Sequence, residues 1–462
     1  TWIALAGSIG LILPSGGSVA ILYGFIFCVL SCFCVAASLG ELSAIWPTAG
    51  GQYHVVFALC TEKWKNPASF VVGWTNIAGW LVVVTVQGYF GAQFISAAAV
   101  VASNGTYEIT AARTYGVFLA ILTFTTAVNI WENKILGKWN DAALYWSILG
   151  VIVIGVVLLS MSEKADAEFV FTSFQNQTGW PDGMSWILGL LQSALSVIGY
   201  DVVLHMTEEM PNPARDSPRA MIYGIAVGGV TGSLFILVIL FCLGNPEAIL
   251  ATATGMPIVE MILQATKSRV AATILSLMLG ICFVNGSSAS ITSASRLLYA
   301  TAPCFERLSE PFCSAVFNVC FGLLYLGPTV AFSAYVASCT IFLDISYAFP
   351  IIVFLIRGRK VLGEHQTERT HFKMGQRWGL AVNAIATFYL VVTSVFFCFP
   401  IAIPVSGSDM MLVAMYWLTY GKTFLGPGFD VIVAQTQGVT AVRVPTPQSS
   451  REGKSEKGTV VH

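Results

Sequence analysis

The sequence predicts an all-α polytopic membrane protein, on three observations. Of the 462 residues, 56% are hydrophobic and only 10% are charged, and the mean hydropathy is +0.75, whereas about a quarter of a soluble globular chain is charged. Apolar stretches repeatedly reach the roughly 20 residues that a membrane-spanning helix needs. One of them, residues 184–207, holds ionisable side chains that a lipid-facing helix would not tolerate. The net charge of −1 gives no reason to expect a nucleic-acid partner.

Ten apolar stretches are long enough to cross a bilayer. They are residues 18–41, 69–101, 115–131, 141–161, 184–207, 219–243, 270–300, 313–331, 333–356 and 379–403. Two shorter apolar pieces, residues 2–13 and 410–420, bring the number of segments to twelve, with the first and last truncated. Thr1 leads directly into apolar sequence, so we expect no signal peptide.

Lys and Arg residues orient these spans. If the first segment runs outward, the inner loops hold fourteen Lys and Arg and the outer loops hold four, and cytoplasmic loops are the ones that carry such an excess. The polar tail, residues 421–462, is then cytoplasmic, and its composition is typical of disorder. We expect an integral protein of the plasma membrane, with the vacuolar membrane as the alternative.

The span at 184–207 is predicted to be broken near Gly199. A broken helix at membrane depth is tolerated where it lines a cavity, and transporters often carry two corresponding breaks, one in each inverted repeat. If ten spans form two repeats of five, the first segment, residues 1–10, corresponds to the sixth. Close helix packing through Gly7 and Gly10 is the alternative explanation for the small residues of that first segment.

Four acidic residues and one histidine are candidates for coupling or gating. Asp201 and His205 are four residues apart and share a helix face, so they could form either a proton relay or a structural pair. Glu208 and Glu209 follow at the cytoplasmic end of the span, where gating or structural roles are favoured over substrate binding. Glu41 lies at the inner end of the second span, where a loop contact is the simplest role.

No enzyme signature is present in the sequence. His205 and Glu209 lack the second histidine of a zinc-protease motif, so we expect no metal, no cofactor and no catalytic group. Trp80 and Tyr200 are instead candidates for holding a cationic amine by cation–π contacts.

Several stretches carry a resemblance to a known family. They include Ala-Ser-Leu-Gly-Glu-Leu at 37–42, Trp-Pro-Thr-Ala-Gly-Gly-Gln-Tyr at 46–53, residues 198–216, and Trp-Gly at 378–379 with Val-Asn-Ala at 382–384. The chain resembles the fungal amino-acid/choline/GABA permeases of the amino acid–polyamine–organocation (APC) superfamily. The resemblance implies a LeuT-like fold with inverted five-helix repeats at 1–162 and 163–357, two further helices at 358–420, and the tail at 421–462.

The same resemblance implies uptake of an amino acid or small amine by alternating access, driven by protons across the bilayer. Carried onto this chain, the substrate site would comprise an unwound helix-one segment (Thr1, Trp2, Ile3, Ala4), Trp80, and an unwound helix-six segment (Ile198, Gly199, Tyr200, Asp201). A carboxylate would bind helix N-termini, whereas a choline-like substrate would use aromatic rings around Trp80 and Tyr200. The sequence leaves these two substrates open, and a transporter-like nutrient sensor is the alternative function.

Overall fold

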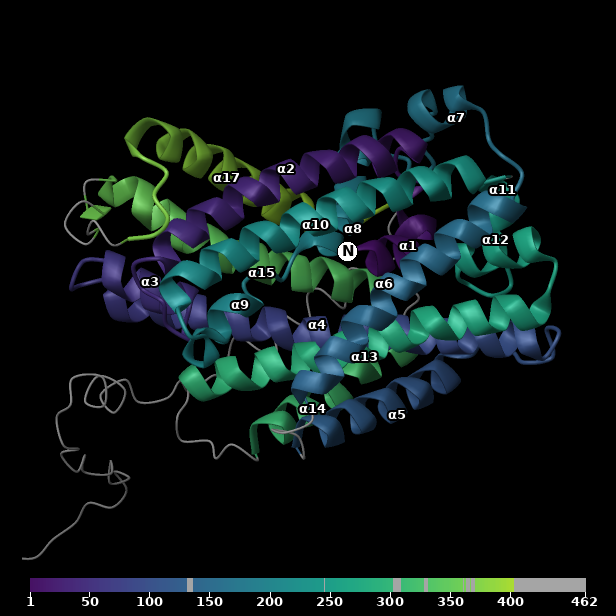
Figure 1. The fold of residues 1–462 in the computed structure, drawn as a ribbon, viewed down its shortest axis with the longest axis horizontal. Coiled ribbons are helices and arrows are strands. Elements are labelled where there is room, and N and C mark those ends of the chain that lie inside the picture. Colours follow the sequence, from purple (N-terminus) through teal and green to yellow (C-terminus); the bar gives the residue numbers. More distant parts are fainter. Residues whose placement is uncertain are drawn as a thin grey trace, which may run out of the picture. The chain divides into compact units, whose positions relative to one another are not determined.

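The computed structural model describes residues 1–130, 136–244, 246–301, 309–327, 331–359, 361, 362, 366 and 370–402 (Figure 1). The helices are α1 (Trp2–Ile12), α2 (Gly17–Ser43), α3 (Gln52–Leu59), α4 (Lys65–Ala102), α5 (Ala111–Ile130), α6 (Leu136–Met161), α7 (Ala167–Thr172), α8 (Asp182–Val197), α9 (Val202–His205), η1 (Thr207–Glu209), α10 (Pro213–Cys242), α11 (Pro246–Leu250), α12 (Pro257–Thr266), α13 (Arg269–Thr301), α14 (Ser309–Gly322), η2 (Leu323–Leu326), α15 (Ala331–Arg357) and α17 (Gln376–Phe396).

The regular elements of the described residues are all helices, with no strand among them, which confirms the all-α polytopic prediction. Nine helical segments within them are long and apolar enough to cross a membrane. The described part of the expected span at 313–331 is shorter than predicted: α14 gives way to the 3-10 helix η2, and Pro311–Leu326 is a shorter apolar helix. Residues 302–308 and 328–330, on either side of it, lie outside the described residues. The predicted piece at 410–420 and the tail at 421–462 lie outside the described residues.

The sixth membrane segment is interrupted at the predicted place. Helix α8 ends at Val197, and α9 begins at Val202, so the four residues from Ile198 to Asp201 are not helical. Gly199 has a φ of +89°, a backbone conformation that residues with a side chain avoid. The glycine therefore allows the chain to leave one helix and enter the next inside an apolar span.

The predicted break in helix one is not seen at Thr1–Ala4. Trp2, Ile3 and Ala4 form the first turn of α1, and the amide of Leu5 donates to the carbonyl of Thr1 (3.1 Å). Helical conformation is natural for this stretch because it contains neither glycine nor proline before Gly7. The described part of helix one is thus continuous from Trp2 to Ile12.

Helix α4 is the buried centre of the bundle, and its most extensive partner is α13. The two helices approach closely at Gly91 and Gly280. A Cβ placed on either glycine would lie 3.8 Å from the other's carbonyl oxygen, and at Gly280 it would also lie 3.2 Å from Ile95. Small residues permit this kind of backbone proximity between membrane helices, so α4 and α13 form a tightly packed pair.

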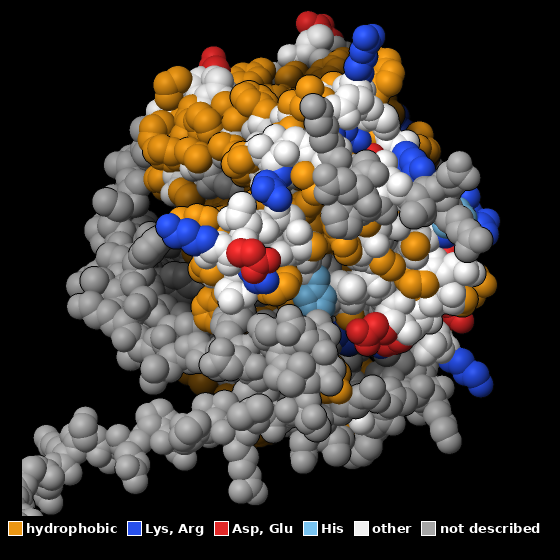
Figure 2. Space-filling view, turned by 90° about the vertical axis from the view of Figure 1, so that its left-hand side faces the viewer, with side chains coloured by type: hydrophobic (Ala, Val, Ile, Leu, Met, Phe, Trp, Pro, Cys, Tyr) orange, Lys and Arg blue, Asp and Glu red, His pale blue; other side chains and the backbone are white. Residues whose placement is uncertain are grey.

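The short helix α3 packs against the end of the broken helix. Gly51, at its N-terminus, has a φ of +53°, and a Cβ there would lie 3.2 Å from Leu204 and 3.4 Å from the His205 ring. Figure 2 looks at the molecule from the side on which α3 lies in Figure 1; Lys, Arg, Asp and Glu side chains lie on this face, and hydrophobic side chains cover much of its flank. This pattern fits a bundle whose polar end carries α3.

Candidate functional site

A cavity of about 190 Å³ opens beside the interrupted helix. Ile198, Gly199 and Val202 line it at the break and just after it, and Ala4 of α1 lines it as well. The remaining lining residues are Trp80, Val83, Val86, Gln87 and Phe90 of α4, Leu195 of α8, Phe283, Ala289, Ser290 and Ser293 of α13, and Cys339 of α15. The α4 residues belong to the middle of a helix that runs from Lys65 to Ala102, so the cavity lies near the centre of the spans.

The cavity wall contains no ionised side chain among its lining residues. Its polar groups are the Gln87 amide and the hydroxyls of Ser290 and Ser293. Each hydroxyl donates its hydrogen to a carbonyl of its own helix, at Gly286 (2.9 Å) and Ala289 (3.1 Å). Both hydroxyl oxygens therefore remain acceptors toward the cavity. A small solute with N–H groups would find partners here.

Backbone groups at the break add donors and acceptors of their own. The amides of Gly199, Tyr200 and Asp201 donate to no acceptor within the described residues, whereas Val202 already donates to the carbonyl of Gly199 (3.3 Å). The last turn of α8 leaves carbonyls without helical donors, as every helix C-terminus does. Such carbonyls favour a cation, and free amides favour an anion. The break thus carries backbone donors and acceptors, and of the three amides that of Gly199 belongs to a residue lining the cavity.

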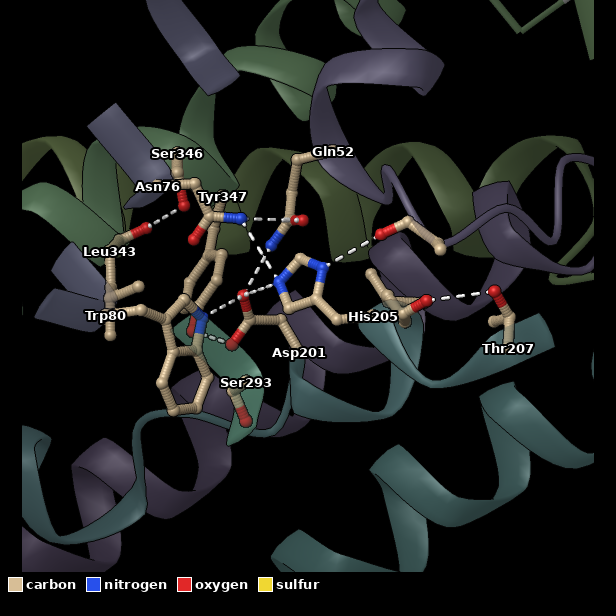
Figure 3. A network of polar contacts seen from close by, with 12 residues as sticks. Gln52, Asn76, Trp80, Asp201, His205, Thr207, Ser293, Leu343, Ser346 and Tyr347 are labelled. Carbon is tan, nitrogen blue, oxygen red and sulfur yellow. Dashed lines mark hydrogen bonds and ion pairs between the residues drawn. The ribbon is translucent and has the colours of Figure 1, made fainter. Parts of the chain in front are cut away.

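A sealed polar network lies directly behind the cavity wall (Figure 3). Asp201, which is fully buried, is its centre. Its Oδ1 accepts from the Tyr347 hydroxyl (2.6 Å), and its Oδ2 accepts from Gln52 Nε2 (2.8 Å) and from the indole Nε1 of Trp80 (3.2 Å). Four elements therefore meet at one carboxylate: α3, α4, the break and α15. Trp80 connects the network to the cavity, since its ring lines the cavity while its N–H holds Asp201.

His205 completes this network from α9. Its Nδ1 lies 3.1 Å from the Ala49 carbonyl, and its Nε2 lies 3.3 Å from both Asp201 Oδ2 and Asn76 Nδ2. The sequence prediction that Asp201 and His205 share a face is confirmed by this contact.

The predicted α1 residues divide between the cavity and its surroundings. Ala4 lines the cavity, but the Trp2 ring turns away from it, donating from Nε1 to Ser147 (3.0 Å) and packing edge-on against Phe235 at 5.2 Å. Thr1 packs against the glycines of α10, and Ile3 contributes to the hydrophobic core.

Tyr200 also turns away from the cavity, and its ring packs against Tyr347 with 5.2 Å between ring centres. Trp80 and Tyr200 therefore do not face one another across the cavity as a cage. The aromatic residues that share the cavity with Trp80 are Phe90 and Phe283, whose rings stack at 4.9 Å.

Glu41 lies far from the cavity, in a buried ion pair. Arg359 Nη2 donates to both of its carboxylate oxygens (2.7 and 2.6 Å), and the amide of Met374 donates to Oε1 (3.0 Å). With its amide oxygen turned toward the arginine, Asn383 accepts from Nη1 (3.2 Å). The expected loop contact of Glu41 is thus present, and it ties α2 to the segment after α15 and to α17.

Glu208 and Glu209 lie on η1, just past the broken helix. Glu209 pairs with Arg296 of α13 (2.8 Å), and both side chains are partly exposed. Close by along α13, the Tyr53 hydroxyl of α3 donates to the Ala300 carbonyl (2.8 Å). Glu208 is exposed and makes no ion pair within the described residues. Contacts at the polar end therefore join α13 to α3 and to the end of helix six.

Sequence reasoning missed most of the α13 wall and most partners of Asp201. Ser290 and Ser293 are three residues apart in an apolar span, a spacing that places both on one helix face and could have revealed them. Gln52 belongs to a stretch that already carried the family resemblance. Tyr347, 146 residues from Asp201 along the chain, gave no comparable signal.

Comparison with known proteins agrees with this architecture. The amino acid permease family model matches residues 3–303. The amino-acid permease BAT1 of Arabidopsis thaliana is 30% identical, covering 90% of this chain and 88% of its own. The choline transporter of Saccharomyces cerevisiae is 28% identical, over 91% of this chain and 79% of the transporter. Amino-acid permease 2 of Neurospora crassa is 25% identical, over 89% of this chain and 80% of the permease. The chain belongs to the amino acid permease family, within the APC superfamily, and is an integral membrane protein.

Proposed function

We propose that this protein is a secondary active transporter that carries an amino acid or a small amine by alternating access, coupled to protons. The observation that carries the proposal is the cavity at the break of helix six, which lies at the middle of α4 and is closed in by several helices. Transporter sites are characteristically built from interrupted helices at this depth. The names of the relatives, amino-acid permease and choline transporter, support the same solute classes.

The cavity chemistry favours a zwitterionic or primary amine over a quaternary one. A substrate carboxylate would accept from the free amides of Gly199–Asp201, and an ammonium would donate to the α8 carbonyls and to the hydroxyl oxygens of Ser290 and Ser293. A quaternary ammonium has no N–H to donate and would depend on the Trp80, Phe90 and Phe283 rings. Of the compounds considered, GABA and amino acids match more of the lining groups than choline does.

We further propose that residues 1–162 and 163–357 form the two inverted repeats, with 358–420 accessory to them and 421–462 cytoplasmic. In support, α1 and α8 pack against each other, as corresponding first helices of two repeats would. The excess of Lys and Arg in the predicted inner loops supports a cytoplasmic location for the polar end that carries α3. The plasma membrane is the proposed location.

The test is transport by the purified chain in liposomes. Labelled GABA, choline and a panel of amino acids would be offered with an inward proton gradient, and binding would be followed separately by thermal shift. A solute at 100 times its Kd should stabilise the protein by about 2.7 kcal/mol. Accumulation that collapses with a protonophore supports the proposal. Stabilisation by a solute without any uptake would favour the sensor function instead.

Ser290→Ala and Ser293→Ala provide variants of the cavity, with Ser160→Ala as the matched control. Ser160 also donates its hydroxyl hydrogen to its own helix (2.7 Å), but it is exposed and far from the cavity. The cavity variants should raise KM for the transported solute, and the control should not. Equal KM values in all three variants would place the site elsewhere.

A further inference from the structure

His205 occupies a position where one ring nitrogen has a fixed role and the other has two competing partners. The Ala49 carbonyl, 3.1 Å from Nδ1, can only accept a hydrogen bond, so Nδ1 carries a proton. Nε2 is 3.3 Å from an acceptor, Asp201 Oδ2, and equally 3.3 Å from a donor, Asn76 Nδ2. The neutral ring can accept from Asn76, and the protonated ring can donate to Asp201. The geometry serves both protonation states.

Asn76 suits only the neutral state of the ring. Its Oδ1 is buried and has no hydrogen-bond partner, while its Nδ2 donates to Gln52 Oε1 (3.1 Å) and faces Nε2. Turning the amide would set Oδ1 against Gln52 Oε1, which is also an acceptor. Asn76 therefore serves the neutral ring as a donor, and the protonated ring has Asp201 Oδ2 as its acceptor.

Asp201 transmits the protonation state to the cavity. A carboxylate oxygen has about two acceptor positions, and Oδ2 already accepts from Gln52 (2.8 Å) and from Trp80 (3.2 Å), while Oδ1 is held by Tyr347 at 2.6 Å. A protonated Nε2 would be a third donor at Oδ2. It would compete first with the longest bond there, which is that of the Trp80 indole. Trp80 lines the cavity and lies 3.5 Å from where a Cβ on Gly199 would be.

We infer that His205 binds the coupled proton at Nε2, and that this displaces the Trp80 indole from Asp201 and loosens the cavity wall. The proton adds to the lone pair of the neutral imidazole, which becomes imidazolium, and Asp201 stays ionised throughout. Release restores the lone pair, Asn76 donates to it again, and Trp80 regains its bond to Asp201. The inference rests on the proposed proton-coupled transport.

Other titratable groups around His205 are too distant or too exposed for this role. Tyr347 of α15 reaches the pair only through Asp201 Oδ1, Tyr53 of α3 donates its hydroxyl to Ala300, and Glu209 and Arg296 pair with each other at a partly exposed position. His54 on α3 contacts Thr48 Oγ1 (2.8 Å). Asp201 is the one titratable group of the described residues that lies within hydrogen-bond distance of His205.

The test compares net, proton-driven accumulation with substrate exchange in liposomes. Exchange of labelled for unlabelled substrate requires the cavity but no net proton movement. His205→Gln should exchange substrate at a rate within about threefold of wild type. Its accumulation of substrate under a pH gradient should be at least tenfold lower than that of wild type, and it should no longer acidify the liposome interior. His54→Gln is the matched control, and it should retain both activities. Proton-driven accumulation by His205→Gln at the wild-type level would overturn the inference.

A second variant separates coupling from structural support. Asn76→Leu removes the donor that stabilises neutral His205, so the pH midpoint of accumulation should move to higher pH by half a unit or more. Loss of both exchange and accumulation in His205→Gln, together with an unchanged midpoint in Asn76→Leu, would assign the network a structural role and refute the inference. Wild-type uptake that ignores the proton gradient would instead refute proton coupling itself, and this assignment with it.

Discussion

Removing one partner of the Glu41–Arg359 ion pair should destabilise the protein strongly. The two side chains are only 1% and 4% exposed, and the guanidinium donates to both carboxylate oxygens. Glu41→Leu leaves a buried guanidinium without its counter-ion, which costs about 3–5 kcal/mol. With an unfolding entropy of about 2.1 cal/mol/K per residue and 462 residues, the expected fall in melting temperature is about 3–5 °C.

A double-mutant cycle in detergent measures the interaction itself. Arg359→Met should also lower the melting temperature, since it leaves Glu41 buried and unpaired, whereas the double variant should melt closer to wild type than either single variant does. Glu62→Gln is the matched control, because the Glu62–Lys65 pair is similarly short (2.6 Å) but its carboxylate is 90% exposed. If the two single shifts simply add in the double variant, the reasoning from burial fails.

Three further predictions follow from the packing of single residues. Gly189→Ala should lower the melting temperature by several degrees, since its Cβ would lie 2.6 Å from a backbone oxygen, whereas Gly183→Ala on the same helix meets nothing within 4 Å and should change little; equal shifts would contradict the packing. Ala4→Val should raise KM by narrowing the cavity, and Trp2→Phe, which removes the bond to Ser147, should lower stability at constant KM. A raised KM in Trp2→Phe with an unchanged KM in Ala4→Val would mean that Trp2, and not Ala4, faces the cavity. Burial lowers the pKa of His54, so the unfolded chain binds a proton more readily than the folded one, and the protein loses stability as pH falls below the ordinary histidine pKa of about 6.5. The melting temperature should therefore fall less between pH 7.5 and pH 5 in His54→Gln than in the wild type. An equal fall in both proteins would exclude His54 as a cause.

The broken helix and its ionisable pair could be predicted because they violate the composition rules of a membrane span. A glycine at position 199 allows a positive φ, which a continuous helix does not contain. Asp201 and His205 are costly in lipid unless they face partners. Local sequence therefore located the break within a few residues. Trp80 was predicted on other grounds, as an aromatic candidate for cation–π contacts and through the family resemblance, and the structure places it against both the cavity and Asp201.

The directions of side chains and the distant partners could not be predicted. Trp2 and Ala4 are two residues apart on one helix, and which of them faces the cavity depends on how α1 packs against α6 and α10. Glu41 and Arg359 are 318 residues apart, and no spacing rule joins them. Tyr200 was expected at the cavity because it lies in the break, but the turn at Gly199 sends its ring toward Tyr347 instead.

The close packing of α4 against α13 gives the cavity two walls whose backbones are packed differently. Separating these helices would part the backbones at Gly91 and Gly280, and the two glycines have no side chains of their own with which to keep contact across the gap. The wall that α4 and α13 build from Phe90, Phe283 and the two serines therefore rests on closely packed backbones, whereas the opposite wall at Ile198 and Gly199 is not helical. Substitutions in the first wall would change the shape of the cavity without changing the break itself.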